Sequence, residues 1–186
     1  MGQIRRIGLI ELGKPYFVLT SALSPASPAW VSRIVDVIVE KDYCSEDPLD
    51  DVRRAMTIRE DDLVFMTAVE SYRFGNRGPF TYFLSAGVEG TGKHAGRTIN
   101  IGLFYDGQLS VNAIVELVKV VTEAKCGTLM DMGLNITGTV TDAVAVGSSG
   151  LTRRTIYAGT GTDIGSLAAR IVSEELREAL RGQRAQ

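Results

Sequence analysis

The sequence predicts an α+β protein in which a mixed β-sheet is layered with helices. Segments rich in β-branched residues dominate the first half of the chain, and the long segments with helical periodicity lie in the second half. This distribution differs from the strict alternation of strand and helix that an all-parallel sheet requires. Because 186 residues suit a single core, we expect one compact domain over residues 1–182 and a polar tail over 183–186.

The N-terminal segments alternate between strand-like and turn-like composition. Residues 4–12 and 15–23 each predict a strand, and residues 13–14 (Gly-Lys) predict the turn that joins them. The segment 23–29 contains two prolines and predicts a loop. The β-branched run at residues 34–39 predicts the next strand.

A helix start follows this run. Asp47 and Pro48 have the residue types of an N-cap and a first helical position, and they predict a helix that reaches about Met56. Residues 63–69 and 80–88 then predict two further strands.

The central segments predict a loop, a strand and a long helix. Residues 87–96 contain four glycines and predict a loop. Residues 98–104 predict a strand, which the Asp-Gly pair at 106–107 would close with a turn. Ser110 can cap a long helix that ends at Gly133.

Two C-terminal elements complete the prediction. Residues 143–146 are small and apolar, as expected of a strand buried on both faces. Thr162 or Thr160 can cap a last helix. Its apolar stripe consists of Ile164, Leu167, Ala168, Ile171 and Val172.

Composition and charge argue against several function classes. Hydrophobic residues make up 45% and charged residues 23%, and the net charge of −2 gives no indication of binding to nucleic acid or an anionic membrane. No uncharged apolar stretch is long enough to span a bilayer, and the N-terminus does not resemble a signal peptide. Cys44 and Cys126 lack C-x-x-C spacing and are expected to be reduced thiols. We therefore expect a cytoplasmic enzyme or binding protein.

Lys125 is the most informative single residue. When residues 110–132 are wound as a helix, Lys125 falls on the apolar stripe and not opposite it. A lysine at such a position must extend its ammonium group out of the core, pair with a carboxylate, or have a lowered pKa. Glu123 lies on the other side of the same helix, where it could pair with Lys119 on the surface. From the residues alone, Glu123 is expected to be solvated.

Asn100 and Asp142 are polar residues beside predicted buried strands. Asn100 alternates with apolar neighbours, so its amide could orient a substrate carbonyl, bind a backbone edge, or serve the structure alone. Asp142 immediately precedes the strand at 143–146 and is flanked by Thr139 and Thr141. Its carboxylate could act as a general base, a helix-dipole partner or a turn cap.

The glycine-rich segment 159–165 (GTGTDIG) leads directly into the last helix. Its backbone N–H groups could hold an anion or a developing oxyanion, or they could simply begin the helix. The segment lacks the Gly-Lys pair of a Walker A loop and the glycine spacing of a dinucleotide-binding fingerprint.

A metal centre and a histidine-based triad are not expected. His94 is the sole histidine, and the chain has no cysteine cluster that could hold zinc. His94 lies in the glycine-rich loop, and no G-x-S-x-G motif is present. We therefore expect His94 to be an ordinary loop residue.

The blocks TINI, TEAK, TGTVTDAVAV and YAGTGTDIG occur in an order and at a spacing that resemble the adenosylcobinamide amidohydrolase family. The upstream segments KDYCSEDP and FMTAV are also similar to it, so the likeness extends from about Leu19 to Ile171. It implies corrinoid salvage, in which the amide that joins aminopropanol to the corrin side chain of adenosylcobinamide is hydrolysed to adenosylcobyric acid and aminopropanol. It also implies a corrinoid substrate that carries its own cobalt, with no cofactor or metal bound by the protein itself.

Amide hydrolysis needs a base or nucleophile, an oxyanion holder and an acid for the leaving amine. We expect Asp142 to be the base and Lys125 to donate to the leaving nitrogen or the oxyanion. Glu123 enters as a catalytic candidate only through the TEAK match. Asn100, Thr139, Thr141 and the segment Gly159, Thr160, Gly161 and Thr162 are expected to contact substrate. Among them, Asn100 and the backbone amides of residues 159–162 are expected to complete the oxyanion hole.

Several alternatives stay open. Thr139, Thr141 or Thr160 could instead be a covalent nucleophile. A non-catalytic carrier of a corrinoid or nucleotide-like ligand, and an amidase for another substrate, are the competing functions. Whether the chain forms a homo-oligomer is also left open.

Overall fold

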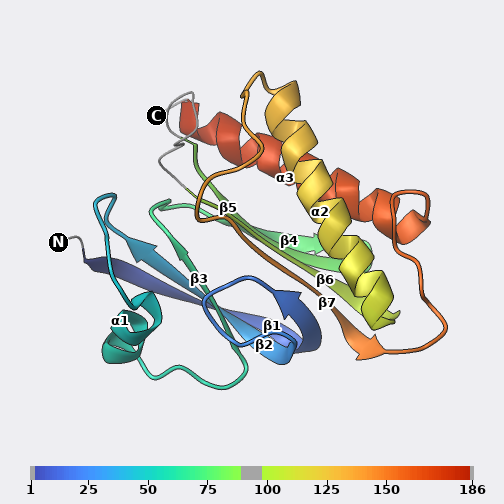
Figure 1. Ribbon diagram of the computed structural model, residues 1–186, viewed down its shortest axis with the longest axis horizontal. Coiled ribbons are helices and arrows are strands. Elements are labelled where there is room, and N and C mark those ends of the chain that lie inside the picture. Colours follow the sequence, from blue (N-terminus) through green and yellow to red (C-terminus); the bar gives the residue numbers. More distant parts are fainter. Residues whose placement is uncertain (1–2, 89–97, 185–186) are drawn as a thin grey trace.

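The computed structural model describes residues 3–88 and 98–184. Within these residues the chain forms a seven-stranded mixed sheet and three helices (Figure 1). The two longest helices lie side by side on one face of the sheet. This layered α+β architecture in one domain confirms the predicted fold class.

The sheet mixes antiparallel and parallel neighbours. Its described strands lie in the order β3-β2-β1-β7-β6-β5-β4, and only the pairs β2–β3 and β6–β7 are parallel. Parallel strands begin at the same edge of a sheet, so the residues that precede β6 and β7 lie together. The strands are β1 (Ile4–Thr20), β2 (Ala29–Val39), β3 (Asp62–Thr67), β4 (Arg73–Arg77), β5 (Phe80–Ala86), β6 (Ile99–Leu109) and β7 (Ala143–Leu151).

Helices α2 (Val111–Asp131) and α3 (Asp163–Arg184) cover one face of the sheet and bury the larger core beneath them (Figure 1). The side-chain oxygens of Ser110 and Thr162 each accept a hydrogen bond of 3.1 Å from a backbone N–H in the first turn. Gly133 follows the end of α2 with a φ of 75°. The predicted caps at Ser110 and Thr162 and the predicted end of α2 are therefore confirmed.

The sheet is strongly curved, so that strands far apart in it contact one another on the face opposite α2 and α3. Phe65 on β3 stacks on Phe83 on β5 with ring centroids 5.3 Å apart. Asn100 on β6 donates its side-chain N–H to the backbone oxygen of Met66 on β3 at 2.9 Å. Three strands separate β3 from β6 in the sheet, so these contacts require the sheet to fold over on itself.

Helix α1 (Pro48–Ala55) begins as the sequence predicts. The Asp47 carboxylate accepts a hydrogen bond of 3.0 Å from the backbone N–H of Asp50. Val52 is fully buried against a cluster on β2 and β3 that includes Val35 and Val64. Helix α1 thus covers the outer side of these two strands, away from the curled interior.

Two predicted turns are wrong, because in both places the strand continues. Residues 4–12 and 15–23 do not form a hairpin, since β1 is one strand that pairs with β2 on both sides of residues 13–14. Gly13 has a φ of 78° and lies within a shift in the pairing register. At residues 106–107, β6 also continues past a register shift. In both cases the turn signal marks an irregularity within a strand.

One strand lies outside the prediction, and the boundaries of several others differ from it, among them β7, which continues to Leu151. Strand β4 was not predicted, because its sequence, RFGNR, has one large apolar residue and forms an exposed edge. Strand β2 begins at Ala29, well before the predicted residue 34.

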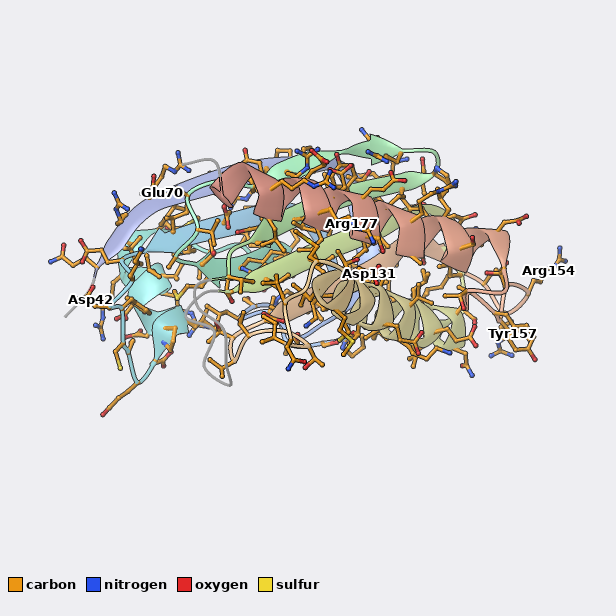
Figure 2. The ribbon with its side chains drawn as sticks, turned by 90° about the horizontal axis from the view of Figure 1, so that it is seen from above. Asp42, Glu70, Asp131, Arg154, Tyr157 and Arg177 are labelled. Atoms are coloured by element: carbon orange, nitrogen blue, oxygen red, sulfur yellow. The ribbon has the colours of Figure 1, made fainter. Side chains whose placement is uncertain are left out.

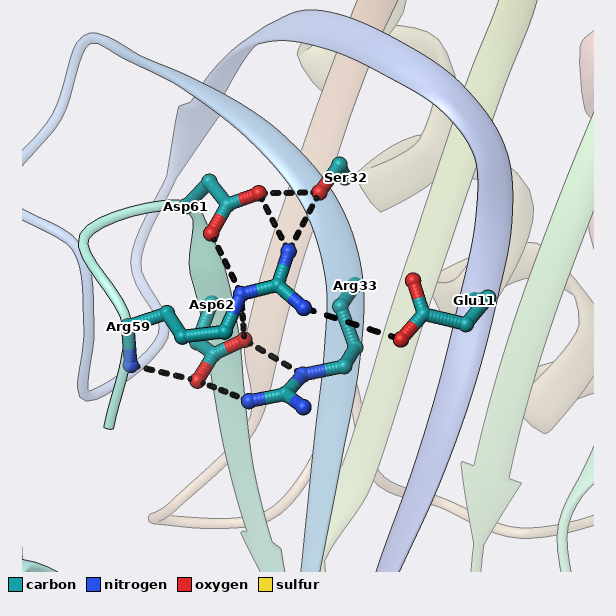
Figure 3. Close-up of polar contacts among 6 residues, drawn as sticks. All are labelled: Glu11, Ser32, Arg33, Arg59, Asp61 and Asp62. Atoms are coloured by element: carbon teal, nitrogen blue, oxygen red, sulfur yellow. Dashed lines mark hydrogen bonds and ion pairs between the residues drawn. The ribbon is translucent and has the colours of Figure 1, made fainter. Parts of the chain in front are cut away.

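A network of charged side chains ties the start of β3 to β2 (Figure 3). Arg33 makes two hydrogen bonds of 2.7 Å to the fully buried carboxylate of Asp62. The backbone N–H of Arg59 donates to the same carboxylate at 2.7 Å, and the Arg59 side chain binds Asp61. The guanidinium of Arg59 holds the pKa of Asp61 well below its usual range. These contacts fix β3 in the register that brings Met66 toward β6.

Asp36 is a buried carboxylic acid in the middle of β2. It is 1% exposed, and its Oδ1 atom has no hydrogen-bond partner among the described residues. Burial raises the pKa of Asp36 from 3.8 to about 7, against a smaller opposing effect of Arg6.

Replacing Asp36 with asparagine is expected to stabilise the protein increasingly from about pH 4 upward, with the full gain above about pH 7. Between about pH 4 and about pH 7 the folded state binds more protons than the unfolded state, so wild-type stability falls as pH rises. Asparagine has no proton to lose, and the gain in unfolding free energy can reach about 4 kcal/mol at high pH. Urea unfolding at several pH values measures it, and parallel pH profiles for the two proteins would contradict the buried-acid interpretation.

None of the helices in residues 3–88 and 98–184 has the length and apolar character needed to cross a bilayer.

Candidate active site

The starts of β6 and β7 hold Asn100 and Asp142 close together. Asn100 pairs in register with Ala143, the residue that follows Asp142. The backbone N–H of Ile99 donates to Oδ1 of Asp142 at 2.9 Å. Two residues that are 42 positions apart in the sequence are thus fixed at the same edge by strand pairing.

Lys125 reaches this edge from helix α2. The helix begins beyond the far end of β6 and runs back, and the Lys125–Asp142 contact shows that its later turns reach the edge where β6 and β7 begin. Lys125 is only 7% exposed, and its Nζ lies 2.5 Å from Oδ2 of Asp142. Of the alternatives for a lysine on an apolar stripe, the structure shows pairing with a carboxylate.

Within residues 3–88 and 98–184, three donors hold the Asp142 carboxylate. Besides the Ile99 amide and the Lys125 ammonium group, the hydroxyl of Thr139 donates to Oδ1 at 2.7 Å. The side chain of Asp142 is 10% exposed. A carboxylate offers about four acceptor positions, so about one is left for a ligand or a water molecule. These contacts orient the Asp142 carboxylate and leave an acceptor position available for a ligand.

Gly138 leaves room for the Lys125–Asp142 pair. A Cβ atom built at position 138 would overlap Oδ2 of Asp142 and would lie 2.6 Å from Nζ of Lys125. Only glycine therefore allows the backbone to pass this close to both charged groups.

The Gly138→Ala variant is expected to lose about 1–3 kcal/mol of unfolding free energy, because the methyl group forces the ion pair apart. Gly127→Ala on helix α2 is the matched control, since a Cβ there meets no atom within 4 Å. That control should be neutral or slightly stabilising, because alanine favours a helix. Urea unfolding compares the variants, and equal stability of Gly138→Ala and wild type would contradict the close packing at the pair.

A cavity of about 600 Å³ opens beside Asp142. Both Asp142 and Asn100 line it, and so does Thr141, whose hydroxyl lies 2.8 Å from that of Thr98. Lys125 and Thr139 are not among the lining residues, so they contact Asp142 from behind the wall. The lining comes from segments 21–23, 39–48, 64–68, 98–100 and 140–143.

Only the N–H₂ end of the Asn100 side chain makes a hydrogen bond to another described residue. The Nδ2 group donates to the backbone oxygen of Met66, which is the contact with a backbone edge that the sequence left open. The Oδ1 atom is buried and has no hydrogen-bond partner among the described residues. Asn100 itself is 0% exposed to solvent.

The segment that follows β2 contributes residues that the sequence analysis did not select. Tyr43, Cys44 and Ser45 line the cavity, and the hydroxyl of Tyr43 donates to Asp51 on α1 at 2.7 Å. Burial raises the pKa of Tyr43. The KDYCSEDP block was the available signal for this wall, but no pattern of charge or periodicity indicated which strand edge it would face.

Glu123 does not join the site. It is exposed on helix α2 and does not line the cavity, whereas Lys125, two residues later, is buried. A regular helix turns residues two positions apart to different sides. The geometry agrees with the solvated position that the residues alone predict for Glu123.

The segment from Gly159 to Thr162 lies at the other end of the sheet. Figure 2 places Tyr157, just before this segment, far from Asp42, which belongs to the cavity-lining stretch. The backbone N–H groups of Ala158 and Gly159 donate to Glu116 at 2.6 and 3.0 Å. The chain leaves the cavity along β7, so the expected oxyanion site shared by Asn100 and the amides of Gly159, Thr160, Gly161 and Thr162 is not formed.

His94 lies outside the described residues. Among residues 3–88 and 98–184, no group of three or more His, Cys, Asp or Glu side chains is placed to hold a metal ion. The expectation that the protein holds no metal stays a prediction.

A model of the adenosylcobinamide amidohydrolase family matches residues 3–186, nearly the whole chain. The chain belongs to this family. No curated protein and no solved structure gives a significant match. The blocks through which the sequence resembles adenosylcobinamide amidohydrolases can now be placed: TINI, TEAK and TGTVTDAVAV meet at the Lys125–Asp142 pair, whereas YAGTGTDIG lies at the opposite end.

Proposed function

We propose that this protein hydrolyses the amide bond that joins aminopropanol to the corrin side chain of adenosylcobinamide, giving adenosylcobyric acid and aminopropanol in corrinoid salvage. The observation that carries the proposal is the Lys125–Asp142 pair at the wall of the cavity, in a chain that belongs to the amidohydrolase family. A buried ion pair is costly to desolvate. Its place beside a cavity favours a role in chemistry.

Asp142 is the proposed general base. Its remaining acceptor position takes a proton from a water molecule while the water oxygen adds to the amide carbonyl carbon. The C–N bond then breaks, and the proton passes from Asp142 to the departing amine, so that one water is consumed for each amide cleaved. Lys125 and Thr139 act as positioning residues, because they hold the two carboxylate oxygens from outside the cavity.

The proposed reaction requires no metal bound by the protein. The cobalt ion belongs to the corrinoid substrate, and the base is a carboxylate already oriented by three donors. The rate of hydrolysis is therefore expected to survive dialysis against EDTA.

The test is to incubate the purified protein with adenosylcobinamide and to measure free aminopropanol by mass spectrometry. Release of the amine in many turnovers supports the hydrolase. Tight binding without release would identify a corrinoid carrier, since a cavity of this kind suits both functions. Cleavage of simple amides together with indifference to the corrinoid would identify an amidase for another substrate.

A further inference from the structure

The orientation of the Asn100 amide is determined by its neighbour. The backbone oxygen of Met66 can only accept a hydrogen bond, so the group of Asn100 that lies 2.9 Å from it must be the N–H₂ donor. The carbonyl oxygen of Asn100 is consequently the end of the amide that stays available to a ligand, since Asn100 lines the cavity. This end can accept a hydrogen bond but cannot donate one.

The unpaired carbonyl oxygen of Asn100 destabilises the protein without ligand, and a ligand that donates a hydrogen bond can remove this penalty. Asn100 is 0% exposed, and its Oδ1 has no hydrogen-bond partner in the described part of the chain. Leaving a buried acceptor unpaired is unfavourable, because the hydrogen bonds that it makes to water in the unfolded chain are lost without replacement. A ligand that brings an N–H group to this position would recover that energy, whereas a carbonyl oxygen or a developing oxyanion would be repelled.

We propose that the carbonyl oxygen of Asn100 accepts a hydrogen bond from the N–H of the amide to be cleaved, and then from the departing amine. This inference rests on the proposed function and assigns one contact within it. It replaces the oxyanion role expected from the sequence, because an acceptor cannot stabilise negative charge.

The placement of Asn100 relative to Asp142 suits this division of roles. Ile99, the residue before Asn100, binds the Asp142 carboxylate, so both groups are fixed by one short stretch of β6. An amide held by its N–H at Asn100 keeps its nitrogen beside the group that must return a proton to it. Asn100 is therefore a determinant of specificity for amides that carry an N–H.

The first experiment compares three ligands that differ only at the linking atom: adenosylcobinamide, its ester analogue and its N-methyl amide. Affinities are measured by calorimetry with Asp142→Asn protein, so that turnover is suppressed. We expect the N–H amide to bind at least about tenfold more tightly than both analogues. Adding Asn100→Leu should abolish the difference, while adding Ser85→Ala, a buried neighbour on β5 outside the cavity lining, should preserve it. An unchanged preference in the Asn100→Leu protein would overturn the inference.

The second experiment does not depend on turnover or on the folding of a variant. Wild-type protein labelled with ¹⁵N is titrated with N-methylacetamide and, separately, with methyl acetate. We expect the side-chain N–H₂ signals of Asn100 to shift in a saturable way with the amide only. The same response to both probes, or a response to neither, would contradict the assignment. If wild-type protein releases no aminopropanol but these signals still respond to the amide alone, the proposed reaction fails and the Asn100 contact stands.

Discussion

Replacing Asp142 with asparagine is expected to lower kcat and kcat/KM together by about 10²–10⁴-fold, the usual cost of losing a general base. Asparagine keeps the size of the side chain and removes its ability to take a proton. Binding of adenosylcobinamide should change far less than the rate. Steady-state release of aminopropanol measures the rate, and calorimetric titration measures the binding.

Asp106→Asn is the matched control for this change. Asp106 also pairs with a lysine, Lys14, at 2.8 Å, but both side chains are about half exposed, far from the cavity. This variant should keep the wild-type rate, because exposed ion pairs contribute little. A near-normal kcat in Asp142→Asn would remove Asp142 from the chemistry.

Replacing Lys125 with methionine is expected to cost about 3 kcal/mol of unfolding free energy, because it leaves the Asp142 carboxylate buried without its cationic partner. Methionine keeps the apolar stem of the side chain, so the packing on helix α2 changes little. Activity should also fall, since Asp142 loses the contact that orients it. Urea unfolding and aminopropanol release measure the two effects.

The double variant Lys125→Met/Asp142→Leu separates stability from activity. Replacing both charges with apolar groups should restore most of the lost unfolding free energy while leaving the protein inactive. Wild-type stability and activity in the single Lys125→Met variant would instead show that the ammonium group merely extends toward solvent.

The ends of the helices could be predicted from the sequence because capping is local. Asp47, Ser110 and Thr162 each bind a backbone N–H three residues later, so a short window of sequence contains the whole interaction. The place of Lys125 on the apolar side of α2 was also predictable, since the apolar stripe of a helix is a local pattern. Its partner was not, because Asp142 reaches it through the register of β6 and β7.

The architecture of the site depends on pairings that no local pattern encodes. The curl of the sheet brings Met66 to Asn100, although they lie on strands separated by three others. The segment 159–162 had residue types suited to an oxyanion site, but β7 carries the chain to the other end of the sheet before this segment begins. The turns predicted at residues 13–14 (Gly-Lys) and 106–107 (Asp-Gly) are wrong for a related reason, because strand pairing continues on both sides of each pair.

The location of the bound substrate decides whether Asp142 and Asn100 belong to the active site. A crystal structure of Asp142→Asn protein with adenosylcobinamide should show the aminopropanol arm in the cavity between residues 39–48 and Asn100. The amide nitrogen should face the carbonyl oxygen of Asn100, and the carbonyl carbon should lie next to position 142. A substrate bound instead at the N-terminus of α3, against Gly159 to Thr162, would contradict the assignment of the active site.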